Sequence, residues 1–390
     1  MTSKKLLFLF LVFMVGVNTV LYAKELKVVW QKAYGDKKKD IAYDSAIDKN
    51  GNIMIAGTTK SWGHGKYDIL ITKLNKKGNP EYRFTYGGKQ NDVAKAIVYT
   101  NDNNFVVAGY SDSYTKYGDK DVYVVKFNKD GKKLWAKSFG GDRDDEALDL
   151  VATANGGVIV VGYTESFGQG YRDGYILYLD KNGKEIWAKA IGGKDDDEIR
   201  AITFSKKGGF FVAGTTRSFN AKGFDFYIAK FDRKAKFQFK RVLGGEEDDE
   251  FNSIVATDDG GCAVAGMTKS FESKHSDIDI MRFSKDGKVL WHKIYGFKSK
   301  EWANSITTTQ NGGFLVAGTT KSFGFGGYDF YLLELNSKGS SIWANVYGND
   351  GDEVANSVKK IDKNNYLVVG KTDSYGLGSY DFMYIKLEKK

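Results

Sequence analysis

The chain has 390 residues, a formal net charge of +9 at pH 7, 46 glycines, a single proline and 15% aromatic residues. This composition is too aromatic for a disordered chain and is typical of β-structure with many turns. The one cysteine, Cys262, excludes an internal disulfide. Packing alone therefore has to hold the fold together, and we expect Cys262 to fill a core position.

Residues 1–23 predict a secretory signal peptide. A basic start precedes an apolar run at residues 6–17, and the small residue Ala23 stands before the first polar stretch. The run is too short for a comfortable membrane span, although the bulky Leu21 leaves an uncleaved anchor as the alternative. We therefore expect an exported protein, periplasmic or secreted, with residues 24–390 as the mature domain. No later segment is apolar enough to span a membrane once the signal is removed.

Seven copies of one unit follow the signal. Each copy holds four short segments rich in Val, Ile, Tyr and Phe and bounded by Gly, Asn and Asp, which predicts four strands. The second segment is the most apolar, the third follows an aspartate, and the fourth carries an aromatic residue before a glycine. That glycine recurs at intervals of 52 or 53 residues, at Gly35, Gly87, Gly140, Gly192, Gly244, Gly296 and Gly348.

Four antiparallel strands in each of seven repeats predict an all-β fold, a seven-bladed β-propeller. A parallel β-helix has much shorter coils, and a helical solenoid would show a period of 3.6 residues, which is absent. The chain begins with a lone fourth-type strand at residues 27–34 and ends on a third-type strand at residues 381–387. We expect the N-terminal strand to complete the last blade and close the ring, because an open ring would expose two sheet edges.

The repeat carries a recognisable phrase: W-x-K-x-[YF]-G-G, a carboxylate, [DN]-G-G, V-A-G-x-T-x-S-[FY]-G and D-x-Y. It resembles the bacterial secreted β-propeller repeat families (SBBP-like repeats) over nearly the whole mature chain. The resemblance implies the fold, and those families share no single activity. A looser similarity, through G-K-x-x-W at residues 131–135, 183–187 and 287–291, links the chain to quinoprotein-type propellers. Those normally have eight blades and further cofactor-contacting groups, and neither is apparent here.

The alternation of strand direction sorts the loops onto two faces. The fourth-to-first and second-to-third connections share one face, which we call the long-loop face, and the two remaining hairpins share the hairpin face. Two carboxylates recur on the long-loop face, one set at Asp40, Asp92, Asp145, Asp197, Asp249, Glu301 and Glu353, and another at Asp68, Asp121, Asp173, Asp225, Asp277, Asp329 and Asp381. A serine followed by an aromatic residue recurs beside them, beginning with Trp62 and Tyr114 as the aromatic members.

We expect these recurring polar residues to fix backbone N–H groups in the loops, because a feature present in every unit is one that each blade needs to fold. The recurring aromatic residues are expected to pack between blades. The alternative is a ring of ligand-binding platforms, of which Trp62 and Tyr114 are the candidate members.

The loops before the first strands of three consecutive blades are densely acidic, and we call residues 142–146, 194–198 and 246–250 the acidic arc. Equivalent loops elsewhere, such as residues 36–40 and 297–301, are basic. Ca²⁺ takes several oxygen ligands, and Asp144, Asp196 and Asp248 are the candidate calcium ligands. A solvated acidic surface is the alternative. The full set of candidate ligand- or partner-binding residues in the arc is Asp142, Asp144, Asp145, Asp195, Asp196, Asp197, Glu246, Glu247, Asp248 and Asp249.

Lysines gather on the hairpin face, where they suit an anionic lipid or polymer or simply maintain solubility. They include Lys76, Lys77, Lys129, Lys132, Lys133, Lys181, Lys184, Lys206, Lys207, Lys285, Lys288 and Lys338.

No catalytic residue is assigned from the sequence. The three histidines do not repeat in register, and no nucleophile elbow, H-E-x-x-H or cysteine nucleophile pattern occurs. We expect a binding or scaffold propeller in the bacterial envelope or outside the cell, without a cofactor other than Ca²⁺.

Its expected partner is a protein or polysaccharide on the long-loop face. We expect a monomer, and no nucleic-acid partner for an exported protein. The alternatives are a glycan-active hydrolase or lyase that uses carboxylates on that face, and a cofactor-binding quinoprotein-like propeller.

Overall fold

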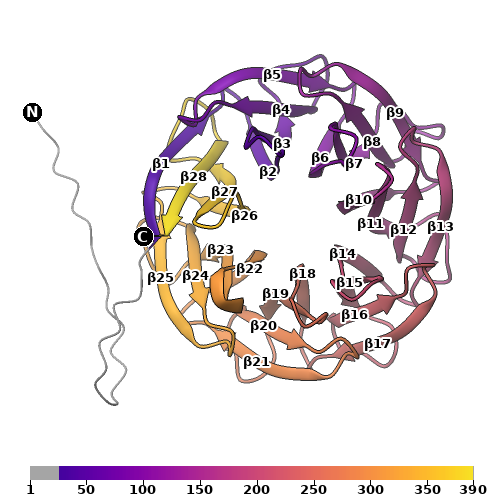
Figure 1. Ribbon diagram of the computed structural model, residues 1–390, viewed down its shortest axis with the longest axis vertical. Coiled ribbons are helices and arrows are strands. Elements are labelled where there is room, and N and C mark those ends of the chain that lie inside the picture. Colours follow the sequence, from indigo (N-terminus) through magenta and orange to yellow (C-terminus); the bar gives the residue numbers. More distant parts are fainter. Residues whose placement is uncertain (1–25, 390) are drawn as a thin grey trace, which may run out of the picture.

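The computed structural model describes residues 26–389, and the predicted signal peptide lies outside them. Seven four-stranded antiparallel sheets stand around a common axis as the blades of a propeller (Figure 1). The predicted all-β, seven-bladed fold is therefore confirmed. The one helical element in the described residues is the short 3-10 turn η1 (Gln310–Gly312), and no helix there is long and apolar enough to cross a membrane.

The blades follow one another along the chain, each with its first strand nearest the axis (Figure 1). Blade 1 contains β2 (Asp40–Ile47), β3 (Ile53–Thr59), β4 (Asp68–Leu74) and β5 (Pro80–Tyr86). Blade 2 contains β6 (Asp92–Tyr99), β7 (Phe105–Ser111), β8 (Asp121–Phe127) and β9 (Lys133–Phe139). Blade 3 contains β10 (Asp145–Ala152), β11 (Val158–Thr164), β12 (Asp173–Leu179) and β13 (Glu185–Ile191).

The second half of the ring repeats this order. Blade 4 contains β14 (Asp197–Phe204), β15 (Phe210–Thr216), β16 (Asp225–Phe231) and β17 (Phe237–Leu243). Blade 5 contains β18 (Asp249–Ala256), β19 (Cys262–Thr268), β20 (Asp277–Phe283) and β21 (Val289–Tyr295). Blade 6 contains β22 (Glu301–Thr308), β23 (Phe314–Thr320), β24 (Asp329–Leu335) and β25 (Ser341–Tyr347). Blade 7 contains β26 (Glu353–Lys360), β27 (Asn365–Thr372) and β28 (Asp381–Lys389), with β1 (Leu26–Tyr34) as its outer strand.

The N-terminal strand closes the ring as predicted. β1 pairs antiparallel with β28 from Leu26 opposite Lys389 to Tyr34 opposite Phe382, with a register shift between Val28 and Trp30. Blade 7 is thus built from both ends of the described chain. Both strands extend slightly beyond their predicted limits, because pairing continues through Leu26 and Lys389.

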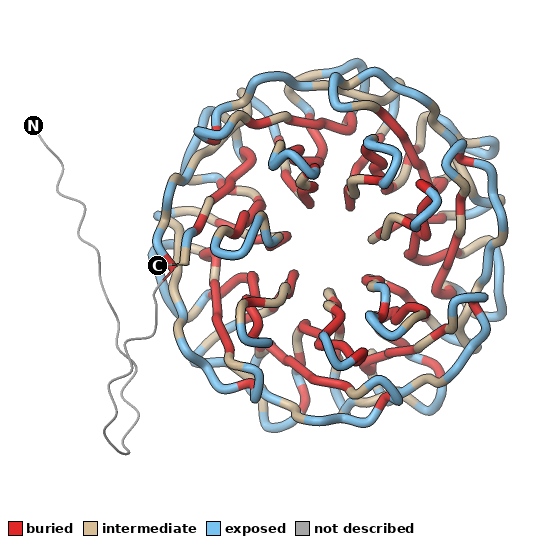
Figure 2. The backbone as a smooth tube through the Cα atoms, in the orientation of Figure 1, coloured by how far each residue is buried: buried red, intermediate tan, exposed pale blue. Residues whose placement is uncertain are grey.

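The core lies between the blades. Every residue of β3, β11, β15 and β23 is buried, because neighbouring blades cover both faces of a second strand. Figure 2 shows the buried backbone in the middle of the blades and the exposed backbone at the outer strands and loop tips. Cys262 is fully buried in this core, as expected, beside Phe251 and Phe283, and burial raises the pKa of its thiol.

The glycine of the V-A-G phrase has a steric role. In blade 3 the first strand bulges between Ala147 and Asp149 where it pairs with β11. A Cβ on Gly162 would lie 1.8 Å from the carbonyl oxygen of Glu146. Only glycine lets the bulged first strand approach this closely, so this position is invariant among the seven repeats.

The two faces carry the loops that the strand order predicts. On the long-loop face, the Lys120 side chain in the β7–β8 loop contacts Asp144 in the β9–β10 loop. On the hairpin face, the Lys126 ammonium donates hydrogen bonds to the carbonyls of Gly156 and Lys181 in two turns of blade 3. The acidic arc and the hairpin lysines therefore lie on opposite faces.

Ring closure predicts a clear cost for losing β1. Deleting residues 24–34 should lower the melting temperature by about 5 °C or more, because β28 would become an open edge and Leu26 would leave its buried site. Thermal unfolding followed by circular dichroism measures this. Val29→Thr, at a residue 45% exposed on the same strand, is the control and should melt like the parent. A deletion variant with the parental melting temperature would contradict the closure.

Candidate functional site

The first recurring carboxylate organises the loop of its own blade. Asp145 accepts hydrogen bonds from the Gly141 N–H at 2.9 Å and from the Ser166 hydroxyl at 2.7 Å. The Thr164 hydroxyl in turn accepts from the N–H groups of Ser166 and Phe167. The same contacts recur in the other blades, for example around Asp92. The expected structural role of the recurring Asp and Ser residues is therefore confirmed.

The second recurring carboxylate lies against the first one of the next blade. One oxygen of Asp173 accepts from the N–H groups of Gln169 and Gly170, both at 2.9 Å. A Cβ on Gly192 would lie 2.2 Å from the other oxygen of Asp173 and 2.5 Å from an oxygen of Asp197. The glycine that reveals the repeat is thus the spacer between two buried carboxyl groups, one from each of two adjacent blades.

In three of these pairs, the carboxyl from the third strand has a clearly raised pKa. Burial, followed by repulsion from Glu353, raises the pKa of Asp329 to about 7. Burial and the neighbouring carboxylate likewise raise the pKa of Asp121 and of Asp225 to about 6. Two carboxylates in one buried site resist ionising together, so these three carboxyls retain a proton to a higher pH than a free aspartate does.

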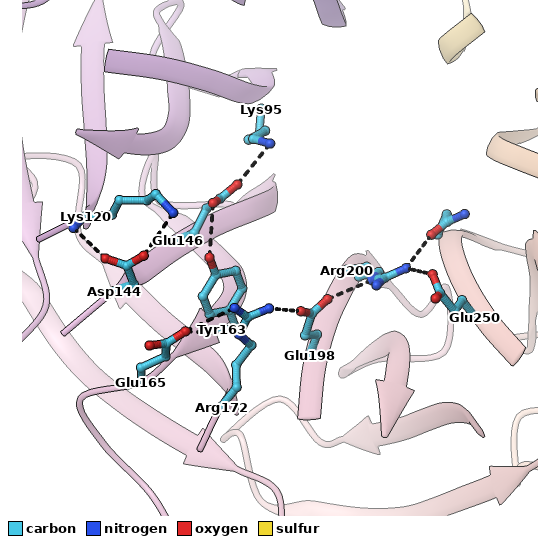
Figure 3. A network of polar contacts seen from close by, with 11 residues as sticks. Lys95, Lys120, Asp144, Glu146, Tyr163, Glu165, Arg172, Glu198, Arg200 and Glu250 are labelled. Carbon is cyan, nitrogen blue, oxygen red and sulfur yellow. Dashed lines mark hydrogen bonds and ion pairs between the residues drawn. The ribbon is translucent and has the colours of Figure 1, made fainter. Parts of the chain in front are cut away.

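A different set of charges lies nearer the propeller axis on the long-loop face (Figure 3). We call it the inner network. Its three acidic members occupy the second position of the first strands of blades 3, 4 and 5, and they are the last residues of the three segments of the acidic arc. The members are Lys95, Glu146, Tyr163, Arg172, Glu198, Arg200 and Glu250.

Contacts between blades hold the inner network together. Lys95 of blade 2 reaches Glu146 of blade 3 at 3.0 Å, and the Tyr163 hydroxyl donates to the same carboxylate at 3.2 Å. Arg172 of blade 3 reaches Glu198 of blade 4 at 2.6 Å. Each cation therefore contacts an anion of the following blade, so the network joins consecutive blades at their inner edge.

Arg200 continues the inner network into blade 5. It contacts Glu198 of its own strand at 3.0 Å, then Glu250 and the amide oxygen of Asn252, the last at 3.0 Å. Burial acts to raise the pKa of Glu198, but Arg200 and Arg172 outweigh it and hold that pKa below its usual range. Each of the three carboxylates contacts at least one cation, which makes the inner edge rigid.

The candidate residues of the acidic arc divide into two groups. Asp145, Asp197 and Asp249 are buried in the loop hydrogen bonds described above and are not accessible to a ligand. The remaining arc candidates lie at or near the surface: Asp142, Asp144, Asp195, Asp196, Glu246, Glu247 and Asp248.

Lysines already neutralise part of the acidic arc. Asp144 accepts from the Lys120 backbone N–H at 3.0 Å and from its ammonium at 2.9 Å. Asp248 pairs with Lys269 at 2.8 Å, and Glu246 pairs with Lys222. Within residues 26–389 no group of three or more Asp, Glu, His or Cys side chains is arranged to hold a metal ion. A calcium ion there would need backbone or water oxygens as further ligands.

The recurring aromatic residues pack on neighbouring rings rather than standing free. Tyr114 stacks on Tyr123 with centroids 5.1 Å apart, and its hydroxyl donates to the Gly87 carbonyl at 2.8 Å. Trp62 stacks on Tyr34 of β1 at 5.3 Å, which is a contact between blades. Tyr114 is still 44% exposed, so one ring face is available to solvent.

A cleft of about 630 Å³ opens beside the inner network, between blades 5 and 6 on the long-loop face. One wall is formed by Glu250 and Asn252, which Arg200 holds in place. The other wall carries Trp302, whose ring packs edge-on against Tyr328 at 5.0 Å. Lys269 and Lys300 add positive charge at the rim, and His275 adds a further polar group. From the sequence only two cleft residues were singled out: Glu250, as the last residue of the acidic arc, and Glu247, a candidate that also lines the cleft.

This arrangement does not favour glycosidase chemistry. Such an enzyme needs a protonated and an ionised carboxyl in the same cleft. Here the carboxyls with raised pKa, such as Asp121 and Asp329, are buried at blade junctions, whereas Glu250 in the cleft is paired with Arg200. A binding cleft accounts better for a wall of partnered charges around one aromatic ring.

Comparisons with known proteins agree on the fold. No family model matches the chain. The regulatory protein FlaEY of Caulobacter vibrioides is 25% identical over 282 residues, which is 63% of this chain and 29% of that protein. The uncharacterized WD repeat-containing protein L264 of Acanthamoeba polyphaga mimivirus is 25% identical over 126 residues, 28% of this chain and 8% of that protein. The chain thus spans less than a third of either relative.

Solved structures show the same architecture at low identity. A protein of unknown function from Dyadobacter fermentans superimposes with a TM-score of 0.53 and 16% identity, covering 94% of this chain and 99% of that one. A mutant puromycin hydrolase complexed with PGG gives a TM-score of 0.54 and 12% identity over 89% of this chain and 52% of that one. These similarities establish the propeller, and membership of the SBBP-like repeat families stays a prediction.

The paired carboxyls predict an unusual pH dependence of stability. A carboxyl whose pKa is raised on folding adds stability when protonated, and that stability is lost as pH rises through the folded pKa. The melting temperature should therefore fall between about pH 5 and about pH 8, the window set by Asp121, Asp225 and Asp329. Asp329→Asn should flatten this slope in thermal melts across the window, whereas the exposed Asp130→Asn should not. Equal slopes for the parent and Asp329→Asn would contradict the pairing.

Proposed function

We propose that the chain is an exported binding module, periplasmic or secreted, that docks a protein partner on its long-loop face over blades 4 to 6. The observation that carries this proposal is the cleft between blades 5 and 6, where Trp302 lies opposite the carboxylate of Glu250 and the amide of Asn252, both of which contact Arg200. Aromatic anchors beside a rigid, pre-ordered surface contribute most of the binding energy in protein interfaces. A polysaccharide is the alternative partner.

The charges around the cleft favour a protein partner that carries both signs of charge over an uncharged partner. Glu247 and Glu250 line the cleft together with Lys269 and Lys300, so it presents charges of both signs. Charges of both signs select a partner with the complementary pattern and fix its orientation. The fold is compatible with this role, since a propeller offers a broad, rigid face on which loops vary.

Site-specific photo-crosslinking tests the proposal. A photoreactive phenylalanine analogue at position 300 should give a discrete protein adduct in the cells that make the chain, because Lys300 is exposed at the rim. The same analogue at position 129 on the hairpin face should give none. Trp302→Ala should reduce the adduct at position 300 at least tenfold. Equal labelling at both positions, or an adduct with glycan alone, would contradict a protein partner on this face.

We also propose that Asp144, Asp196 and Asp248 bind Ca²⁺. A cation bound only to the folded state raises its apparent stability by mass action. Millimolar Ca²⁺ should therefore raise the melting temperature more than NaCl at equal ionic strength. Changing the three aspartates to asparagine should abolish the difference. If both salts act alike on the parent protein, the acidic arc is a solvated or partner-docking surface.

A further inference from the structure

The junction between blades 3 and 4 departs from its neighbours on the hairpin face. At the junction before it, Lys126 donates to the carbonyls of Gly156 and Lys181, at 3.1 and 3.0 Å, and so clamps blade 2 to blade 3. One repeat later, Tyr178 takes the place of that lysine. Its hydroxyl bonds with Asn155 of its own blade at 3.1 Å instead. In the described chain, no side chain donates to the equivalent carbonyls of Gly208 and Arg233.

A second departure lies in the turn that faces Tyr178. Five of the other third-to-fourth-strand turns have a glycine with positive φ at the equivalent position, such as Gly183, but here the residue is Ala235 with φ of 57°. A left-handed alanine is strained by about 1 kcal/mol or more. Strained residues persist where the surrounding structure or a function requires them, and this one is buried against Ile159 and Phe210.

A methyl group at this position is incompatible with the place that Trp135 takes beside Gly183. A Cβ on Gly183 would lie 2.9 Å from the Trp135 ring, whose indole N–H donates to the Lys181 carbonyl at 3.0 Å. Trp187 is the equivalent residue beside Ala235, and it makes no such bond within the described chain. The indole N–H of Trp187 and the carbonyl of Arg233 are both left without the partners that the neighbouring junction gives them.

These two changes leave a cleft of about 550 Å³ between the blades. Tyr178 and Trp187 form its aromatic lining, with ring centroids 5.7 Å apart and planes at 59°, and Phe204 is 39% exposed beside them. Arg233 and Lys234 lie exposed at the rim and form no ion pair within residues 26–389. No acidic side chain lines the cleft.

We propose that this cleft binds an acidic sugar unit, a hexuronate or a sulfated hexose within a polysaccharide. Aromatic faces pack against the C–H face of a sugar ring, whereas the free carbonyls of Gly208 and Arg233 accept from its hydroxyls. The Trp187 indole N–H donates to a ring or hydroxyl oxygen. The Arg233 guanidinium has the planar fork that pairs with a carboxylate or sulfate. The site is distinct from the docking face proposed above, and neither depends on the other.

Titration with defined oligosaccharides tests this site. Tetragalacturonate should quench tryptophan fluorescence with an affinity at least tenfold higher than that of neutral tetragalactose, and added NaCl should weaken only the acidic ligand. Trp187→Phe should remove the quenching signal, which isolates this tryptophan from the others. A sulfated tetragalactose distinguishes the two anionic groups, and binding of either acidic ligand supports the proposal.

Two variants restore what the neighbouring repeats carry at these positions, so both are compatible with the fold. Tyr178→Lys should refill the cleft and re-form the clamp, and Ala235→Gly should let Trp187 move to the position of Trp135. Each should lower the affinity for tetragalacturonate at least tenfold without lowering the melting temperature. Lys285→Ala, at an exposed lysine elsewhere on the hairpin face, is the control and should leave the affinity unchanged.

Three results would overturn the proposal. Equal affinities for the acidic and neutral oligosaccharides would remove the role of Arg233 and Lys234. Unchanged binding in both restoring variants would place the ligand elsewhere on the protein. Tighter binding of ATP than of any oligosaccharide would assign the cleft to a nucleotide instead.

Discussion

The fold depends on a pair of buried carboxyl groups at each blade junction. Asp173 and Asp197 show the arrangement: each fixes the loop of its own blade, and the two meet across Gly192, where no side chain fits. Hydrogen bonds to backbone N–H groups offset the cost of burying the carboxyls. The same carboxyl pair with its spacer glycine recurs at the blade junctions, and it fixes the spacing between the blades. The other contacts at these junctions differ from one blade to the next.

The contacts that differ from one blade junction to the next determine the chemistry of each surface. On the inner edge of the long-loop face, Lys95, Arg172 and Arg200 each reach a glutamate of the following blade. On the hairpin face, Lys126 clamps one junction, whereas Tyr178 and Ala235 leave the next one open. A propeller of near-identical blades thus places two chemically different clefts on opposite faces by changing a few residues at single junctions.

The sequence predicted the fold well because repetition multiplies a weak signal. Seven copies of one strand pattern outweighed any ambiguity in a single copy, and the unpaired strand types at the two ends predicted the closure. It predicted the clefts poorly. The recurring Asp145, Asp197 and Asp249 are structural, while Trp302 and Arg200 were missed. Contacts such as Lys95 with Glu146 join residues one repeat apart, and only an alignment of the repeats with each other, together with the knowledge of which strands face one another, would have singled them out.

The closure of blade 7 has a consequence for how the chain reaches its native state. Among the described strands, β1 is synthesised before the other strands of the propeller, and its partner β28 is synthesised after them. Until β28 is made, β1 has no partner strand, and its backbone groups hydrogen-bond only to water. A contact between strands so far apart in sequence is slow to form. A chain that stops before β28 cannot close the ring, so β1 stays unpaired in it. The lysines at positions 27 and 32 of β1 give this waiting strand the charge that discourages pairing with a strand of another molecule.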